Sequence, residues 1–256
     1  MKRILSRIIG AMGYSLVRRS RLDGFNRALA RARDLDFLAA MPEAQVGRLL
    51  SLLPESQAQL RQDLFVLSEL GFRREGYFVE FGAANGKSLS NTWLLEKHFG
   101  WTGIVAEPAR CWHAELARHR GCVIDHRCVW KRSGDRLGFS QAPEAELSTI
   151  STYEAGDMHA KARRDSSRYE VETVGLEDLL AGHRAPDSPD YLSIDTEGSE
   201  LEILSSYDFA RRPFKVITCE HNHTPAREAI HRLLTKAGYV RKYEKLSDFD
   251  DWYVRA

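Results

Sequence analysis

Long apolar runs are missing from this sequence of 256 residues: none approaches the roughly 18 to 20 residues that a helix needs to cross a bilayer. CxxC pairs and the spacings typical of zinc sites are missing too, although the chain has four cysteines. This pattern indicates reduced thiols in a cytoplasmic protein rather than a disulfide framework. An excess of charge of one sign is also lacking. Because the formal net charge is only +1, the overall charge gives no reason to expect a nucleic-acid partner.

The first 21 residues combine basic side chains with apolar residues at helical spacing, and they contain no acidic residue. Arg7 interrupts the apolar core that a secretory signal would need. Met1–Arg21 could form a basic amphipathic helix that lies on an anionic membrane, which would place the protein at the inner face of the membrane. We favour a helix that packs on its own domain with its arginines in solvent, because short basic amphipathic N-termini are common and nonspecific.

The pattern of apolar residues divides the chain into two regions. In residues 1–74, apolar residues recur every three to four positions, with Pro42 and Pro54 as breaks, which predicts a helical segment behind the basic N-terminus. In residues 75–256, short β-rich runs alternate with helical stretches, which predicts βαβ units and an α/β fold with a mostly parallel sheet. The expected strands are 77–81, 103–107, 121–125, 190–195 and 214–220.

The C-terminal end and one long interval complete the expected organisation. After a helix near 225–237, residues 239–245 and 251–255 are expected to form an antiparallel pair of strands. The interval 131–170 is polar and rich in turn-forming residues, and a segment of this length without strong periodicity is usually a lid, a substrate loop or mobile. Arg163 and Arg164, inside this interval, are expected to lie in solvent.

The segment Tyr77–Ser88 is the most informative part of the chain. An apolar run carries a carboxylate, Glu80, and is followed by Gly82 and Gly86 before helix-forming sequence resumes. This order predicts a buried strand, a tight turn and a helix N-terminus, where open α/β sheets bind nucleotide-like ligands. The turn lacks the G-x-G-x-x-G pattern of dinucleotide-binding proteins, because Ala84 stands where the second glycine would be. Glu80 would repel a pyrophosphate and attract an ammonium group.

Acidic residues end the expected strands: Glu80, Glu107, Asp195, Glu220 and, with His126 beside it, Asp125. Because the carboxyl ends of parallel strands share one edge of a sheet, these acids should line a single crevice. Glu107 follows Gly86 by about 20 residues and can accept hydrogen bonds from both hydroxyls of a ribose. This spacing also fits an NAD site. The turn after the first strand favours S-adenosylmethionine, which has a ribose and an ammonium group but no phosphate.

Three segments of the chain resemble a known family. Residues 80–86 (EFGAANG) resemble motif I of class I S-adenosylmethionine-dependent methyltransferases. Residues 173–180 (TVGLEDLL) and 191–204 (YLSIDTEGSELEIL) are similar to the FkbM methyltransferase family, whose hallmark is a T-L-D-D-L-L run followed by K-I-D-V-E-G-A-E. The resemblance covers about residues 75–245. Ser193 stands where the family usually has lysine and Thr196 where it has valine, so the chain lacks a cation at the first of these positions.

This resemblance implies an enzyme with a Rossmann-like sheet, S-adenosylmethionine across its first three strands, and O-methylation of a hydroxyl on a sugar or small metabolite. The acceptor would be a small molecule or a glycan. The residues that it places beside the methionine part of the cofactor are Glu80, Gly82, Ala84, Asn85 and Gly86. By the same resemblance, Glu107 would bind the ribose, and Asp125 and His126 would lie near the adenine.

The acceptor hydroxyl must lose its proton during such a methyl transfer, so a base or a metal ion would be useful. Asp195 and Glu220 are the expected catalytic residues, together with His221. As in the metal-dependent catechol-type methyltransferases, Asp195 with Glu220 or His221 could hold Mg²⁺ or another divalent ion. Alternatively, Asp195 and Glu197 shape a turn and cap the next helix. We favour a base or positioning role over a metal site, because two or three ligands underdetermine such a site.

Two other functions stay open on the sequence. An NAD-dependent oxidoreductase would use the same ribose-binding carboxylate. A non-catalytic membrane-peripheral protein would keep the fold and use Met1–Arg21 as its anchor. The complete set of acidic strand ends favours an active enzyme, so we rank the methyltransferase first. The sequence indicates neither the identity of the acceptor nor the oligomeric state.

Overall fold

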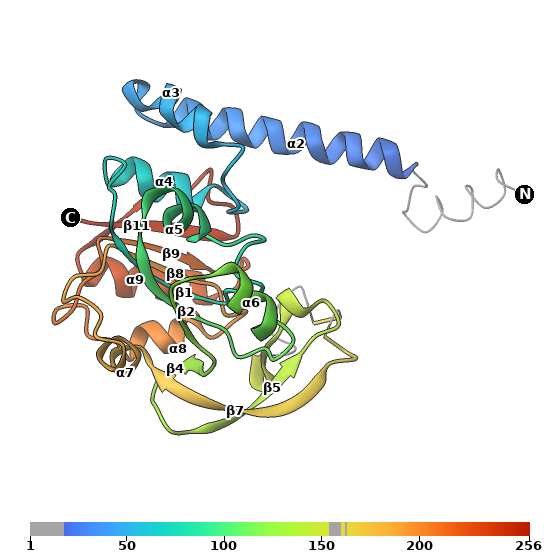
Figure 1. Ribbon diagram of the computed structural model, residues 1–256, viewed down its shortest axis with the longest axis vertical. Coiled ribbons are helices and arrows are strands. Elements are labelled where there is room, and N and C mark those ends of the chain that lie inside the picture. The colour runs from blue at the N-terminus through green and yellow to red at the C-terminus, as the bar shows by residue number, and fades with distance from the viewer. Residues whose placement is uncertain (1–17, 154–159, 162) are drawn as a thin grey trace, which may run out of the picture. The chain divides into compact units, whose positions relative to one another are not determined.

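The computed structural model describes residues 18–153, 160–161 and 163–256 (Figure 1). The expected basic helix at Met1–Arg21, with its membrane contact, therefore lies almost wholly outside the described residues. None of the described helices has both the length and the apolarity that a membrane crossing requires. The chain divides into two compact units, Met1–Val46 and Gly47–Ala256, so residues 47–74 are grouped with the sheet rather than with the N-terminal segment.

In the described residues, three helices precede the first strand: α2 (Arg19–Ala40), α3 (Glu43–Leu52) and α4 (Gln62–Glu69). Pro42 separates α2 from α3, as expected, because a residue before proline is driven out of the helical conformation. Met41 accordingly has an extended backbone with ψ of 157°. The side chains of α4 are buried from Gln62 to Ser68, which makes this helix part of the core of the second unit.

The main sheet has seven strands in the order β10-β11-β9-β8-β1-β2-β3. Their bounds are Tyr77–Phe81 (β1), Thr102–Ala106 (β2), Val123–Asp125 (β3), Tyr191–Ile194 (β8), Val216–Glu220 (β9), Tyr239–Lys242 (β10) and Asp250–Arg255 (β11). Five neighbouring strands of this sheet, β9, β8, β1, β2 and β3, pair in parallel, whereas β11 is antiparallel to both β9 and β10. The sequence predictions of five parallel strands and a C-terminal antiparallel pair are therefore confirmed.

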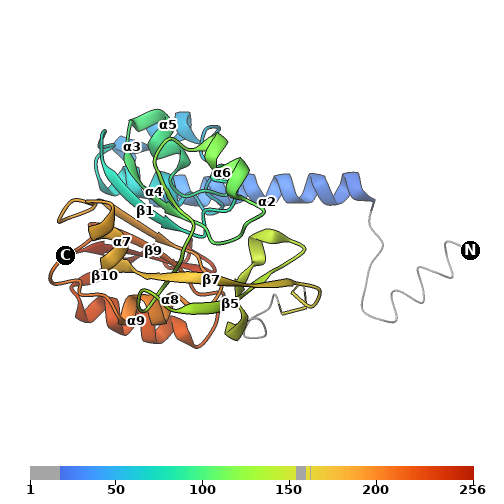
Figure 2. The ribbon, with the colours of Figure 1, turned by 60° about the horizontal axis from the view of Figure 1, so that its bottom comes forward.

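Helices cover both faces of this sheet. The helices that follow the strands are α5 (Trp93–Phe99), α6 (His113–His119), α7 (Leu176–Gly182), α8 (Glu200–Ser205) and α9 (Ala226–Lys236). Figures 1 and 2 show α4, α5 and α6 on one face, and α8 and α9 on the other. Apolar side chains on both faces of the central strands are buried, including Phe78, Val79 and Phe81 of β1. Burial on both faces explains why these strands read as nearly continuous apolar runs in the sequence.

A second, four-stranded sheet occupies the region expected to be a long loop. Its order is β4-β7-β5-β6, with bounds Cys128–Trp130 (β4), Arg136–Gln141 (β5), Thr149–Ile150 (β6) and Ser167–Gly175 (β7). The expectation of a long loop at 131–170 is therefore wrong for the residues that form β5, β6 and the start of β7. The inner face packs Phe139, Ile150 and Val171 into a small core. Residues 168–174 of β7 (RYEVETV) alternate polar and apolar side chains, the pattern of a half-buried strand that the sequence prediction overlooked.

Candidate functional site

A cavity with about 800 Å³ of empty space, its open mouth included, lies where β1, β2 and β8 end. One wall contains Gly82–Ala84 and Ser88–Ser90 from the loop after β1, with Glu107 from the end of β2. Asp195–Glu197, after β8, supplies a second wall, and the second sheet supplies a third through β4, β5 and β6. The crevice that the sequence predicted at the carboxyl edge of the sheet is therefore present.

The two glycines after β1 have different steric reasons to be glycine. Gly82 has φ of +73°, and a Cβ there would lie 1.8 Å from the backbone carbonyl oxygen of Asp195. Gly86 has φ of +79°, and its Cβ would meet the side chains of Leu116 and Arg120 at 2.5 and 2.7 Å. Positive φ values favour glycine because it has no Cβ. Gly82 thus lets the loop after β1 touch the backbone at the end of β8, and Gly86 lets the same loop pack on α6.

Glu80 does not line the cavity. Its side chain is 3% exposed and accepts hydrogen bonds from Ser90 Oγ, from the Asn91 backbone N–H at 2.7 Å and from Thr92 Oγ1 at 2.6 Å. The Arg120 guanidinium completes the set with an ion pair at 3.1 Å. In the described structure Glu80 therefore fixes the loop after β1. Its direct attraction of a ligand ammonium stays a prediction.

Asn85 also acts within this loop, because its Oδ1 accepts the backbone N–H groups of Lys87 and Ser88. Neither Asn85 nor Gly86 is among the residues that line the cavity, whereas Gly82 and Ala84 are. Of the residues expected beside the methionine part of the cofactor, the structure thus brings two to the cavity wall. The other three hold the loop in shape.

The position where the family usually has lysine is occupied by a buried serine. Ser193 pairs with Glu80 in the register of β1 and β8, and its Oγ accepts a hydrogen bond from Asn91 Nδ2 at 2.9 Å. A cation at this position would lie close to Glu80. In this chain Arg120, from the end of α6, supplies that positive charge.

Glu107 lines the cavity and joins the loops after β1 and β2. It accepts the backbone N–H of Ala84 at 2.8 Å and that of Ala109 at 2.7 Å. Burial raises the pKa of Glu107 to about 7, because the two hydrogen bonds only partly offset desolvation and the nearby Asp195 adds negative charge. The carboxylate oxygens have lone pairs left to accept hydrogen bonds from a ligand hydroxyl. The predicted ribose-binding residue is therefore placed where that role is feasible.

Asp125 and His126 lie away from the cavity wall. Asp125 pairs with the Arg127 guanidinium through two hydrogen bonds and with His183 Nε2 at 2.9 Å. Although burial raises the pKa of Asp125, these partners outweigh it and hold the value at about 2. His126 is exposed and stacks on His113, with 3.7 Å between the ring centroids. The expected adenine contacts of Asp125 and His126 stay predictions, and Pro108, Cys128 and Val129 line the cavity there instead.

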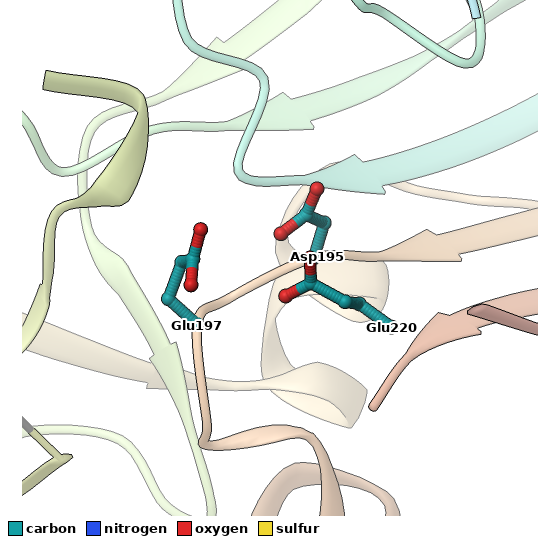
Figure 3. A group of neighbouring side chains, drawn as sticks. All are labelled: Asp195, Glu197 and Glu220. Carbon is teal, nitrogen blue, oxygen red and sulfur yellow. The ribbon is translucent and has the colours of Figure 1, made fainter. Parts of the chain in front are cut away.

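Three carboxylates gather where β8 and β9 end. One oxygen each from Asp195, Glu197 and Glu220 lies within 4.8 Å of the other two, and Figure 3 shows the three side chains turned toward a common space. The expected proximity of Asp195 and Glu220 is confirmed. Sequence reasoning missed Glu197 as a partner of this pair, although its place two residues after Asp195 was a signal for it. We call Asp195, Glu197 and Glu220 the acidic cluster.

The negative charge of the acidic cluster is only partly compensated. Burial raises the pKa of Asp195 to about 6, although its hydrogen bond with Glu220 opposes the rise. Burial and the charges of Asp195, Glu197 and Glu200 raise the pKa of Glu220 well above its ordinary value. Arg163 is fully buried, rather than solvated as expected, and its Nη2 lies 2.8 Å from Glu197 Oε2.

The expected turn and cap roles belong to a neighbouring acid. Glu200 Oε1 accepts the backbone N–H of Thr196 at 2.9 Å and that of Gly198 at 3.1 Å. Glu200 thus organises the turn that leads into α8. Asp195 and Glu197 are consequently left with their carboxylates in the acidic cluster.

His221 is not brought to the cavity wall. It is buried, and its Nδ1 accepts the His223 backbone N–H, while its Nε2 lies 3.8 Å from Asp251 on β11. Burial lowers the pKa of His221, and the charges of Arg227 and His223 act in the same direction, against the opposing effect of Asp251. A catalytic or metal-binding role for His221 stays a prediction, and its described partners lie outside the cavity.

The model of the methyltransferase FkbM domain matches residues 80–249. No curated protein matches the chain. Similar solved structures include the precorrin-6y C5,15-methyltransferase of Geobacter metallireducens GS-15, at 15% identity and a TM-score of 0.40 over 75% of this chain and 85% of that one. The METTL16 MTase domain is 11% identical, with a TM-score of 0.42 over 77% of this chain and 66% of that one.

A SAM-dependent methyltransferase from Aquifex aeolicus is likewise 11% identical, with a TM-score of 0.37 over 81% of this chain and 96% of that one. The family match carries more weight than these structural likenesses. It covers more than half of the chain, and it includes the loop after β1, Glu107 and the whole acidic cluster. It also decides against an NAD-dependent oxidoreductase. The chain therefore belongs to the FkbM family of S-adenosylmethionine-dependent methyltransferases.

Proposed function

We propose that this protein transfers a methyl group from S-adenosylmethionine to a hydroxyl group of a sugar or another small metabolite. The observation that carries the proposal is that two kinds of wall share one cavity. Gly82, Ala84 and Glu107 lie on one wall, and Asp195 and Glu197 lie on another. A donor held at the first wall would present its reactive end to an acceptor held at the second.

The residues of the first wall suit S-adenosylmethionine. Gly82 and Ala84 offer backbone with little side-chain bulk, and Glu107 offers carboxylate oxygens to the hydroxyls of a ribose. When bound, S-adenosylmethionine supplies a methyl group on a positively charged sulfur. The main task of the protein is then to hold the acceptor oxygen in line with that methyl group.

Asp195 is the residue best placed to take the proton of the acceptor hydroxyl. It lines the cavity, and its pKa of about 6 lies much closer to neutral pH than that of an ordinary aspartate. A general base is most effective when its pKa lies near the working pH.

The donor assignment is tested by calorimetric titration of S-adenosylmethionine into the full chain. We expect Glu107→Ala to weaken binding at least about tenfold, the loss of roughly 1.4 kcal/mol or more, because a hydrogen-bonded hydroxyl pair is lost. Glu144→Ala, at an exposed carboxylate outside the cavity wall, should leave the affinity unchanged. Equal affinities in the wild-type protein and Glu107→Ala would remove the ribose assignment.

The reaction itself is tested with S-adenosylmethionine that carries a labelled methyl group, incubated with fractionated cell extract. We expect the label to enter a carbohydrate or small-metabolite fraction through a base-stable ether bond. Asp195→Asn should slow incorporation by about 10² to 10⁴-fold while S-adenosylmethionine still binds. Binding without incorporation in any fraction would favour the non-catalytic alternative.

A further inference from the structure

The acidic cluster has the dimensions of a cation site. Oxygens around one ion at metal–oxygen distances of about 2.0 to 2.6 Å are separated by at most about twice that distance. The three ligand atoms of Asp195, Glu197 and Glu220 all lie within 4.8 Å of one another. This spacing is inside the limit for the longer of these bonds, and a side-chain movement of about half an ångström brings it inside the limit for Mg²⁺. Their side chains come from the loop after β8 and the end of β9, and they converge on one space (Figure 3).

A second observation also points to a missing ligand. Glu220 is 8% exposed, and its Oε2 is buried without a hydrogen-bond partner among the described residues. A buried carboxylate oxygen without a partner is costly, because it has lost its hydration and gained nothing in return. A cation in the space between the three carboxylates would supply the missing partner.

The charges around the acidic cluster support the same conclusion. Arg163 forms an ion pair with Glu197, and Asn222 Nδ2 approaches the same oxygen at 3.3 Å. Among the described residues, Asp195 and Glu220 have no ion pair with a basic side chain. Two facing carboxylates, one buried and one half-buried, repel each other when no cation lies between them, so a positive ion at this place would be strongly favoured.

We propose that Asp195, Glu197 and Glu220 bind a divalent cation that prefers oxygen ligands, Mg²⁺ or Mn²⁺. Oxygen ligands select such ions, and the cavity beside the acidic cluster leaves room for the water molecules that Mg²⁺ retains. His221 takes no part, because its ring nitrogens face the His223 backbone and Asp251.

The cation site rests on the proposed function for its role but not for its existence. Because Asp195 and Glu197 line the cavity, the acceptor oxygen can replace a water molecule on the cation. Binding to a divalent ion lowers the pKa of the hydroxyl and orients its oxygen. A carboxylate has two oxygens, so Asp195 can contact the cation with one and accept the proton of the hydroxyl with the other.

The site is tested by titrating Mn²⁺ into the metal-free full chain and following the free-ion signal by electron paramagnetic resonance. We expect one bound Mn²⁺ per chain, displaced by Mg²⁺. Glu220→Gln and Asp195→Asn should weaken Mn²⁺ binding at least about tenfold, because each keeps the shape of the side chain and removes a charge. Glu146→Gln changes a carboxylate that lines the same cavity but lies outside the acidic cluster, and this variant should bind Mn²⁺ as the wild-type protein does.

Thermal unfolding and S-adenosylmethionine titrations on the same variants separate the possible failures. Loss of Mn²⁺ binding in a variant that still folds and binds S-adenosylmethionine supports the site. Wild-type protein without stoichiometric Mn²⁺, or equal Mn²⁺ affinity in Glu220→Gln and Glu146→Gln, overturns it and leaves the methyltransferase proposal standing. Mn²⁺ binding without any S-adenosylmethionine binding would instead overturn the proposed function and leave the cation site in place.

Discussion

Acidic residues of two kinds meet at the same edge of the sheet. Glu80 and Asp125 are paired with the guanidinium groups of Arg120 and Arg127, and neither lines the cavity. Glu107 and Asp195 line the cavity and have no ion pair with a basic side chain among the described residues. The difference shows which carboxylates stabilise the fold and which remain available to a ligand, although all of them end strands of one sheet.

We call an acid that is paired with a guanidinium group a compensated acid. The largest expected effect on stability comes from removing the charge partner of such an acid. The Arg120 side chain is fully buried and forms ion pairs with Glu80 at 3.1 Å and with Glu96 at 2.6 Å. Arg120→Met therefore leaves two carboxylates without their positive partner. We expect a loss of about 3–5 kcal/mol in the free energy of unfolding, measured with urea. Arg118→Met, at an exposed position of the same helix, should cost less than about 0.5 kcal/mol. Equal losses in the two variants would contradict the division between the two kinds of acid.

A smaller effect is expected where the two walls of the cavity touch. Gly82→Ala combines a positive φ with a Cβ 1.8 Å from the Asp195 carbonyl oxygen, so the backbone must move. We expect about 2–4 kcal/mol of destabilisation and weaker binding of S-adenosylmethionine. Gly134 has φ of +84° with no atom within 4 Å of its Cβ position, so Gly134→Ala isolates the cost of the positive φ alone, about 1 kcal/mol. Equal losses of unfolding free energy in the two variants would show that the loop after β1 can move away from Asp195 at little cost.

The smallest effect is a pair of opposite pH dependences. The pKa of Glu107 is raised from 4.5 to about 7, so its contribution to stability is complete below pH 4.5 and is lost as the pH rises through 7. The pKa of Asp125 is lowered from 3.8 to about 2, so its contribution is complete above pH 3.8 and is lost as the pH falls through 2. Each amounts to about 1–3 kcal/mol.

Urea unfolding of metal-free protein between pH 2 and 8 measures these contributions. Glu107→Gln should flatten the fall in stability between pH 4.5 and 7, and Asp125→Asn should flatten the fall at the acid end. Glu107→Gln with an unchanged pH profile would place Glu107 among the compensated acids.

The sequence predicted the main sheet and its acidic edge because both depend on local pattern. Apolar runs mark the strands, and Glu107, Asp195 and Glu220 stand at or next to the ends of three of them. The charge partners could not be predicted, because Arg120 lies 40 residues from Glu80 and Arg163 lies 34 residues from Glu197. Residues so far apart in the sequence are brought together only by the packing of the folded chain. The second sheet was overlooked for another reason. The interval 131–170 was interpreted from its polar composition, although residues 168–174 alternate polar and apolar side chains as a half-buried strand does.

The close approach at Gly82 joins two walls of the cavity, the loop after β1 and the segment after β8. Because the loop after β1 lies against the backbone carbonyl of Asp195, a shift of that loop must displace the start of the segment after β8, and the reverse also holds. The two walls of the cavity therefore change shape together rather than independently.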